Sequence, residues 1–348
     1  MPDPKVIEGD YVRDILEQPS ALRNTLTTLS PTRDLKRLAG ELNRGQFERI
    51  VLTGMGSSFH VVHPLNLALI AAGFTAILVE TSELIHYQHP FFDSKTLVVA
   101  VSQSGESVEM VRLLAMNRRR SPIIAVTNSR RSRLATAATA TVLTGAGKEF
   151  SVSCKTYLTA LMALEWLGDV LCEKNLGRTR QELAQAPLAV ERYLTHWKDH
   201  VRRLAGALKK IRHLFLVGRG ASLAAVGTGA LIIKESDHFH AEGMSSAAFR
   251  HGPFEMLSRE TLVLVFAGAL KTKKLNHRLW RDIREKDGQA EIVGETGSGP
   301  AYRLPAVPIS LLPMLEILPV QMITLALAAC RGREAGRFEL ASKVTTVE

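Results

Sequence analysis

Hydroxyl and amide side chains follow an apolar, strand-like run in the sequence VVAVSQSGES, residues 98–107. They are Ser102, Gln103, Ser104 and Ser107. A helix expected to begin near Ser107 would add free N–H groups and the positive end of its dipole, and Gly105 would let the backbone approach a ligand. Because a helix cap needs only one hydroxyl, the cluster predicts a site for a phosphate monoester.

A second turn with hydroxyls, GMGSS at residues 54–58, follows the preceding apolar run. Its hydroxyls belong to Ser57 and Ser58. Gly54 and Gly56 also fit the opening of a dinucleotide fingerprint, but the third glycine of that motif does not follow, and the chain has no P-loop Gly-Lys-Ser/Thr. Two hydroxyl turns therefore favour a phosphate site over a nucleotide site, and no cofactor is expected.

Acids and histidines are frequent in residues 235–255. They are Glu235, His238, His240, Glu242, His251 and Glu255. Moving a proton between adjacent sugar carbons needs a carboxylate base, and opening a hexose ring needs a separate acid or base; Glu and His suit these tasks near neutral pH. A metal site at His238, His240 and Glu242 is the alternative, but the segment has no established ligand spacing and no metal is expected. His251 differs because the Gly-Pro that follows it predicts a tight turn.

Three apolar runs recur in the same order in the two halves of the chain. The pairs begin at Ile50 and Leu214, Thr96 and Thr261, and Pro122 and Ala290, which are 164, 165 and 168 residues apart. Longer helical stretches separate the runs, a pattern typical of right-handed βαβ units. We expect an α/β fold of two tandem doubly wound, flavodoxin-like parallel sheets, each in an α/β/α sandwich, in pseudo-twofold arrangement. Ligands of such sheets bind at the carboxyl ends of strands, where both hydroxyl turns are expected.

The repeats also predict domain boundaries. A helical lead is expected over residues 1–46, a first domain with the phosphate site over 47–190, a second domain with the acid–base residues over 200–335, and a tail over 336–348. The linker between the two domains is expected within the charged, helical stretch Gly177–Lys210.

The composition is that of a globular chain, with 348 residues, 46% hydrophobic and 22% charged. Three scattered cysteines and an acidic, polar N-terminus without a signal peptide favour the cytoplasm. The apolar stretch Leu311–Cys330 contains Pro313, Glu316 and Pro319, which predicts a buried helix and no membrane contact. The net charge of +10 is dispersed and lacks interleaved aromatic residues, so no nucleic-acid partner is expected.

Several motifs together resemble the double SIS (sugar isomerase) domain family, in particular the isomerase half of glucosamine–fructose-6-phosphate aminotransferase. They are GMGSS (54–58), VSQSGES (101–107), EFSVSCKTYLT (149–159), KESDHFHAEG (234–243), RHGP (250–253) and LASKVTTVE (340–348). The resemblance implies that Ser57, Ser58, Ser102, Gln103, Ser104 and Ser107 bind the phosphosugar and that Val152 and Cys154 close over the sugar.

The same resemblance implies catalytic roles for three residues. Glu235 matches the glutamate that moves a proton between C1 and C2, and His251 matches the ring-opening histidine. Lys343 matches the tail lysine that forms an imine with the keto sugar, so the tail is expected to close the active site. Because the family often lends the histidine from a neighbouring subunit, a homodimer with shared active sites is expected.

Departures from the family pattern bear on the reaction. Ile232 stands where the aminotransferase has a lysine, Thr228 stands where it has a glutamate, and we expect that the protein lacks the glutaminase domain. Without that ammonia source we expect the breakdown direction, from glucosamine 6-phosphate to fructose 6-phosphate and ammonia through an enediol or enolamine. The alternatives are a fructosamine-6-phosphate deglycase, an aldose–ketose phosphosugar isomerase and a non-catalytic sensor of sugar phosphates.

Overall fold

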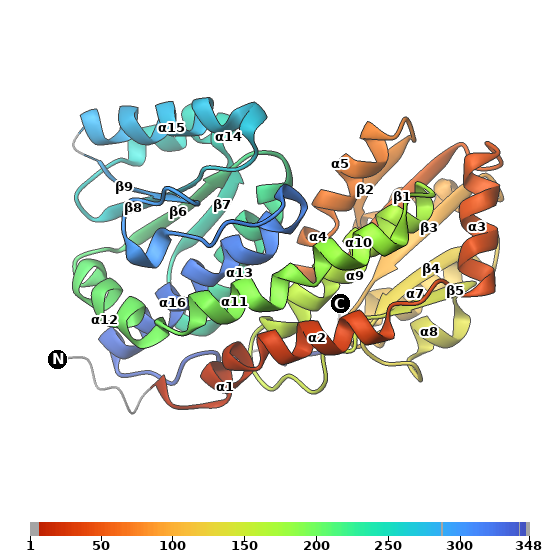
Figure 1. Cartoon of the computed structure of the whole chain (residues 1–348), viewed down its shortest axis with the longest axis horizontal. Coiled ribbons are helices and arrows are strands. Elements are labelled where there is room, and N and C mark those ends of the chain that lie inside the picture. Colours follow the sequence, from red (N-terminus) through yellow and green to blue (C-terminus); the bar gives the residue numbers. More distant parts are fainter. Residues whose placement is uncertain (1–6, 287, 341, 346–348) are drawn as a thin grey trace. The chain divides into compact units, whose positions relative to one another are not determined.

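Two parallel β-sheets organise the chain (Figure 1). This computed structural model describes residues 7–286, 288–340 and 342–345. Sheet A has the strand order β2-β1-β3-β4-β5, and sheet B has the order β7-β6-β8-β9. Sheet A comprises β1 (Arg49–Gly54), β2 (Ala76–Glu80), β3 (Thr96–Val101), β4 (Ile123–Thr127) and β5 (Ala140–Leu143). Sheet B comprises β6 (His213–Gly218), β7 (Ala241–Ser245), β8 (Thr261–Phe266) and β9 (Gln289–Val293).

The duplication predicted from the sequence is confirmed by the strand register. In sheet A, Arg49 of β1 pairs with Thr96 of β3, and in sheet B, His213 of β6 pairs with Thr261 of β8, all in parallel. Each central pair is flanked by β2 or β7 on one side and by β4 or β9 on the other. The fold is therefore two tandem doubly wound α/β domains, as expected, while their pseudo-twofold arrangement stays a prediction.

Chain contacts group the residues into two units, each built around one sheet. The sheet A unit holds Ser20–Lys148, Lys155–Ala184 and the tail from Leu340, and the sheet B unit holds the chain up to Pro19, Glu149–Cys154 and Gln185–Glu339. The domain boundaries predicted from the sequence are continuous ranges. The contact-based units differ from them because each unit also includes segments from elsewhere in the chain. Residues 1–6 of the predicted lead and residues 341 and 346–348 of the predicted tail lie outside the described residues.

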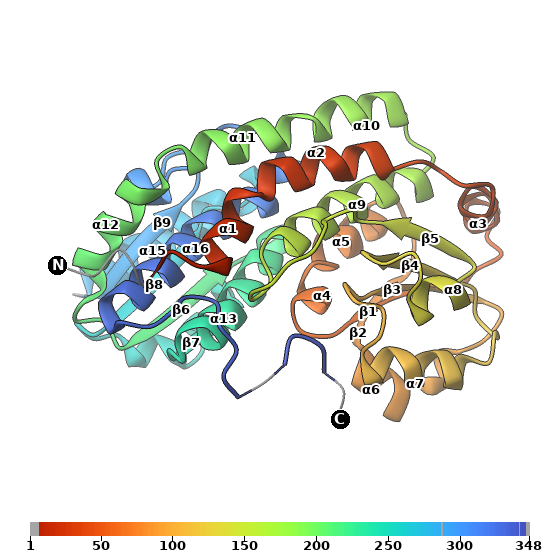
Figure 2. The ribbon, with the colours of Figure 1, turned by 90° about the horizontal axis from the view of Figure 1, so that it is seen from below.

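Helices cover both faces of sheet A (Figure 2). Helices α6 and α7 lie on one side with α8, and α9 lies on the other side with α3 and α5. The helices are α2 (Gln18–Thr28), α3 (Arg33–Asn43), α4 (Ser57–His60), α5 (His63–Ala71), α6 (Thr81–His86), α7 (Val108–Asn117), α8 (Arg133–Ala137), α9 (Lys155–Leu171) and α10 (Leu176–Leu183). The expected sandwich is confirmed, and helices α2 and α3 fall within the predicted helical lead.

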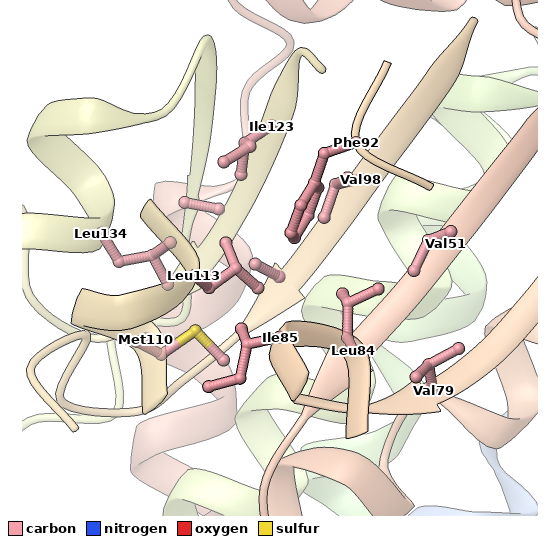
Figure 3. Close-up of a cluster of buried hydrophobic side chains, with 12 residues drawn as sticks. Val51, Val79, Leu84, Ile85, Phe92, Val98, Met110, Leu113, Ile123 and Leu134 are labelled. Carbon is pink, nitrogen blue, oxygen red and sulfur yellow. The ribbon is translucent and has the colours of Figure 1, made fainter. Parts of the chain in front are cut away.

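The core on the α6–α8 side of sheet A consists of aliphatic strand residues packed against one aromatic and several aliphatic helix and loop residues (Figure 3). Val51, Val98 and Ile123 come from three adjacent strands, and Leu84 and Leu113 come from α6 and α7. Strand residues on the opposite face, such as Leu52, are buried as well. Burial on both faces is what a parallel sheet requires, and it makes the strands read as continuous apolar runs.

Sheet B is covered in the same way. Helices α14 and α15 supply Phe249, Leu279 and Ile283 to one core, against Phe215 and Val263 of the sheet. Helix α13 packs on β6 and β7 and also on α16, which packs in turn on α12. The helices of this unit are α1 (Asp10–Leu16), α11 (Gln185–Leu194), α12 (Trp197–Leu208), α13 (Leu223–Asp237), α14 (Ser246–Arg250), α15 (Leu270–Glu285) and α16 (Leu312–Arg331).

Helix α16 is the apolar stretch that the sequence predicted to be a buried helix. Within the described part of the chain it is the one helix whose length and hydropathy would allow it to cross a membrane, and 94% of that apolar window is buried inside the protein. Thr324 on its buried side donates a hydrogen bond to the hydroxyl of Tyr11 in α1, at 3.1 Å. Helix α16 is thus a core helix, as predicted.

Candidate active site

The hydroxyl turn after β3 is held open by its own hydrogen bonds. The Oγ of Ser102 accepts from the N–H of Gly105 at 3.1 Å, and the Oγ of Ser104 accepts from the N–H of Glu106 at 3.2 Å. The Oγ of Ser107 caps α7 by accepting from the N–H of Met110 at 3.5 Å. In each case the hydroxyl uses an oxygen lone pair and keeps its own hydrogen for donation. Three donors aimed by the turn can therefore serve an anion.

Gly105 is needed at the centre of this turn. Its φ is +65°, in the left-handed region, and a Cβ added there would lie 2.4 Å from the Oγ of Ser132. The carbonyl of Gly105 accepts from the N–H of Leu134, and the carbonyl of Gln103 accepts from the N–H of Asn128. These bonds tie the turn to the loop before α8 and fix its position at the end of the sheet.

The second hydroxyl turn, after β1, lies beside the first because β1 and β3 are paired neighbours. Gly56 has a φ of 52° and starts the short helix α4, which carries the half-buried Ser57 and Ser58. A Cβ added to Gly54 would lie 2.6 Å from the carbonyl oxygen of Ser58. The carboxyl ends of parallel neighbours meet at one edge of a sheet, so the two turns that carry the six residues predicted to bind the phosphosugar lie at the same edge of sheet A.

The C-terminal tail also reaches this edge. The N–H of Val108, in the first turn of α7, donates to the carbonyl oxygen of Thr345 at 3.2 Å. Lys343 lies two residues earlier and is exposed. The tail thus brings an amine into the region of the hydroxyl turns, within the sheet A unit.

The acid–base residues come from the sheet B unit. Glu235 is half-buried in the last turn of α13, and Ile232 and Thr228 on the same helix are buried. His251 is exposed and follows α14, and its N–H donates to the carbonyl of Ala248 at 2.9 Å. Gly252 has a φ of 142°, and Pro253 begins η4 (Pro253–Met256), so the predicted tight turn after His251 is present.

Val152 and Cys154 lie in a buried loop of the sheet B unit, and both are fully buried. The N–H of Val152 donates to the carbonyl of Gly336 at 3.3 Å. One carboxylate oxygen of Glu149 accepts from the N–H of Cys154 at 3.0 Å and from its thiol at 3.5 Å. The loop backbone is therefore anchored by an acid that the sequence analysis did not single out.

Asp14 is a second anchor that was missed. Its Oδ2 accepts from the N–H groups of Phe150 and Ser151, at 2.8 and 3.1 Å, and from the Oγ of Ser151 at 2.9 Å. Asp14 itself is buried in α1. The available signal was an acid on the apolar face of an otherwise amphipathic helix, a position that needs hydrogen-bond donors.

The histidines considered as metal ligands are used differently. His238 ends α13 with a φ of 47°, and both of its ring nitrogens lie 3.2 Å from the guanidinium of Arg333. His240 lies 3.4 Å from Glu242. No group of three or more His, Cys, Asp or Glu side chains in the described ranges is close enough to hold a metal ion.

Comparison with known proteins decides the family. A profile of the SIS domain matches residues 46–168 and again residues 207–331. The chain belongs to the SIS domain family. The first SIS match contains both hydroxyl turns, and the second contains Glu235 and His251.

Relatives of this SIS chain are enzymes by name. Glutamine–fructose-6-phosphate aminotransferase (isomerizing) of Pyrococcus horikoshii is 27% identical over 355 residues, which cover 98% of this chain and 58% of the relative. The chain thus spans little more than half the length of the curated relatives that it matches.

Solved structures agree with this assignment. The crystal structure of a proposed phosphosugar isomerase from Silicibacter pomeroyi is 28% identical with a TM-score of 0.77, and covers 93% of this chain and 99% of that one. Glucosamine-6-phosphate deaminase of Thermotoga maritima shares the fold, with a TM-score of 0.77 and 17% identity over 97% of this chain and all of that one. Together these similarities support an enzyme of the SIS family.

Proposed function

We propose that this SIS chain converts glucosamine 6-phosphate and water to fructose 6-phosphate and ammonia. The observation that carries the proposal is the pair of adjacent hydroxyl turns at the carboxyl edge of sheet A, whose serine O–H groups remain available to a phosphate ester. The names of the aminotransferase relatives and of the Thermotoga maritima deaminase contain fructose 6-phosphate and glucosamine 6-phosphate. A hexose 6-phosphate of this class would be held by its phosphate in these turns.

The chemistry follows from the residues proposed to face the open sugar. His251 transfers the proton that opens the ring, and Glu235 removes the proton from C2 and returns it to C1 through an enolamine. The nitrogen on C2 is then an imine. The amine of Lys343 adds to C2 and displaces ammonia, and water finally releases the ketone and restores the lysine. Atoms balance, because one water enters and one ammonia leaves.

An aldose–ketose phosphosugar isomerase is the second candidate, and the similarity to the Silicibacter pomeroyi structure favours it. The same transfer of a proton between C2 and C1 interconverts an aldose and a ketose when C2 carries oxygen in place of nitrogen. Deglycation of a fructosamine 6-phosphate would start from the ketose side of the same proton transfer. The three reactions differ in the products that they release.

The test measures ammonia and fructose 6-phosphate released from glucosamine 6-phosphate by the purified chain. Glu235→Gln is expected to lower kcat by roughly a hundredfold or more, the usual scale for a general base. Glu242→Gln is the matched control, because it removes an exposed carboxylate of the same unit that pairs with His240. Its activity should stay within about twofold of the parent, since a solvated surface charge makes no contact with the reacting atoms.

Each outcome separates the candidates. Interconversion of neutral aldose and ketose phosphates without ammonia would make the chain an isomerase, and release of an amino acid or amine from a fructosamine 6-phosphate would make it a deglycase. Sugar-phosphate binding without turnover of any of these substrates would contradict an enzyme and favour a sensor. The homodimer with shared active sites and the cytoplasmic location stay predictions.

A further inference from the structure

A cavity of about 450 Å³ lies in the sheet B unit, between α11, α12 and the segment that starts with η5 (Pro300–Tyr302). Its walls carry three arginines and two histidines, contributed by all three elements. They are Arg192, His196, His200, Arg203 and Arg303. None of the residues proposed to bind or convert the sugar phosphate lines this cavity.

The arginines of this cavity have no counter-ions among the residues that the structure describes. None of Arg192, Arg203 and Arg303 makes a side-chain hydrogen bond or ion pair with any described residue. The one acid on the wall, Asp199, is already paired with Arg202 at 2.6 Å. Guanidinium groups around a concave surface that has no unpaired acid repel one another and attract anions into it.

His200 adds a buried polar atom to the same wall. The side chain is only 6% exposed, and its Nδ1 is buried without a hydrogen-bond partner among the described residues. Burial lowers the pKa of His200, and His196 and Arg203 act in the same direction, while the Tyr193 backbone and Asp199 oppose them. A buried ring nitrogen without a partner is costly, and the same side chain lines the cavity.

The rest of the wall is rigid and apolar. The ring of His200 lies 4.7 Å from that of Tyr193, and the hydroxyl of Tyr193 donates to the carbonyl of Ala301 at 2.6 Å. This bond ties α11 to η5, and Leu304 next to the turn is buried. This tilted ring pair and the aliphatic surface suit the organic part of a ligand.

We propose that this cavity binds a phosphorylated small molecule, with the phosphate groups held by the three arginines and His200. Guanidinium groups pair with phosphate oxygens through two parallel hydrogen bonds, and several of them can share one polyanion. The concave shape and the volume suit a metabolite of small-molecule size. An extended polyanion such as RNA would instead follow a charged stripe on the surface.

The experiment titrates the full chain with inorganic pyrophosphate by calorimetry. The double variant Arg203→Gln with Arg303→Gln should weaken pyrophosphate binding at least tenfold, because each guanidinium supplies charge-assisted hydrogen bonds. The matched control, Arg212→Gln with Arg281→Gln, removes two positive charges at exposed positions of the same unit outside this cavity. It should leave the Kd within about twofold, the size of a screened long-range effect.

A second control separates this site from the hydroxyl turns. Ser102→Ala with Ser104→Ala should weaken the binding of glucosamine 6-phosphate and leave a pyrophosphate site with the parent affinity. Three results would overturn the inference: no pyrophosphate binding, equal loss in the two arginine pairs, or loss of all pyrophosphate binding in the serine variant. A clear preference for single-stranded RNA over pyrophosphate, abolished by the same arginine variant, would also overturn it. Ligand binding is measured without turnover, so failure of the proposed reaction leaves this test intact.

Discussion

The carboxyl edges of the two sheets share the backbone conformation of one turn but differ in the polar side chains that they carry. Ser58 after β1 and Ser222 after β6 are equivalent positions, and the turns share glycines with positive φ, 52° at Gly56 and 61° at Gly220. After β3 the chain continues with the hydroxyl turn, whereas after β8 it continues with Ala267-Gly-Ala269. Both edges thus keep the glycine turn after the first strand, but only the edge of sheet A has the cluster of hydroxyls after the second central strand.

The polar groups that remain at the edge of sheet B face inward. The Oγ of Ser222 donates to Glu316 at 2.8 Å, and the amide of Asn276 donates to the carbonyls of Phe266 and Ala267 at 2.9 and 3.2 Å. All three side chains are buried. They satisfy the protein itself, while the serines of sheet A retain free O–H donors. The two edges therefore differ in their unused hydrogen-bond donors and not in the backbone of their turns.

The largest effect is expected from adding a side chain to the glycine of the hydroxyl turn after β3, Gly105. Gly105→Ala combines a positive φ with a clash against Ser132, so we expect the free energy of unfolding to fall by roughly 3 kcal/mol. Binding of glucosamine 6-phosphate should fall with it. Chemical denaturation and calorimetry measure the two effects.

Gly147→Ala is the control for backbone strain alone. Gly147 also has a positive φ, +72°, but no atom lies within 4 Å of an added Cβ. Its cost should be about 1 kcal/mol with unchanged sugar-phosphate binding. Equal costs in the two variants would show that packing around Gly105 does not hold the turn.

Paired serine variants test whether the two edges differ in use. Ser222→Ala removes the hydrogen bond that the buried Glu316 accepts from Ser222, so the free energy of unfolding should fall by about 1–3 kcal/mol while sugar-phosphate binding stays unchanged. Ser102→Ala should instead weaken binding, since it removes an available O–H donor. Chemical denaturation measures the stability of both variants, and calorimetry measures their binding of sugar phosphate. Weakened binding in Ser222→Ala would contradict the proposed difference between the two edges.

The smallest expected effect is a pH dependence of stability. Burial raises the pKa of Glu316 from 4.5 to about 8, partly offset by the hydrogen bond from Ser222. Between about pH 4.5 and about pH 8, Glu316 is protonated in the folded state and ionised in the unfolded state. Its contribution to the free energy of unfolding therefore declines as the pH rises through this range.

Glu316→Gln removes that proton equilibrium. Relative to the parent, the variant should gain at least about 1 kcal/mol of unfolding free energy between pH 5 and pH 8, because one pKa unit corresponds to about 1.4 kcal/mol. Urea unfolding at both pH values measures the change. A parent-to-variant difference that does not vary with pH would show that Glu316 is ionised inside the folded protein.

Sequence analysis predicted the strands and most helices because their apolar periodicity is local. Helix α16 was recognised as buried despite its proline, and the paired runs predicted which strands are equivalent. The anchors Asp14 and Glu149 were not predicted, because both accept hydrogen bonds from backbone N–H groups of a loop that has no periodic pattern. The N–H groups belong to Phe150, 136 residues from Asp14, and to Cys154, 5 residues from Glu149. The cavity arginines were missed for the same reason, since residue 303 lies 100 residues beyond residue 203.

The sequence alone determined the duplicated parallel sheets and the position of the hydroxyls at strand ends, because alternation of apolar runs and helices leaves few ways to bury both faces of a sheet. Tertiary structure decided which polar groups are spent within the protein and which remain available. Hydrogen bonding is a short-range, directional interaction between residues that are often distant in sequence. Only the folded arrangement shows that Ser222 donates to Glu316, that Thr345 accepts from α7, and that three arginines line one cavity whose single acid, Asp199, is paired with Arg202.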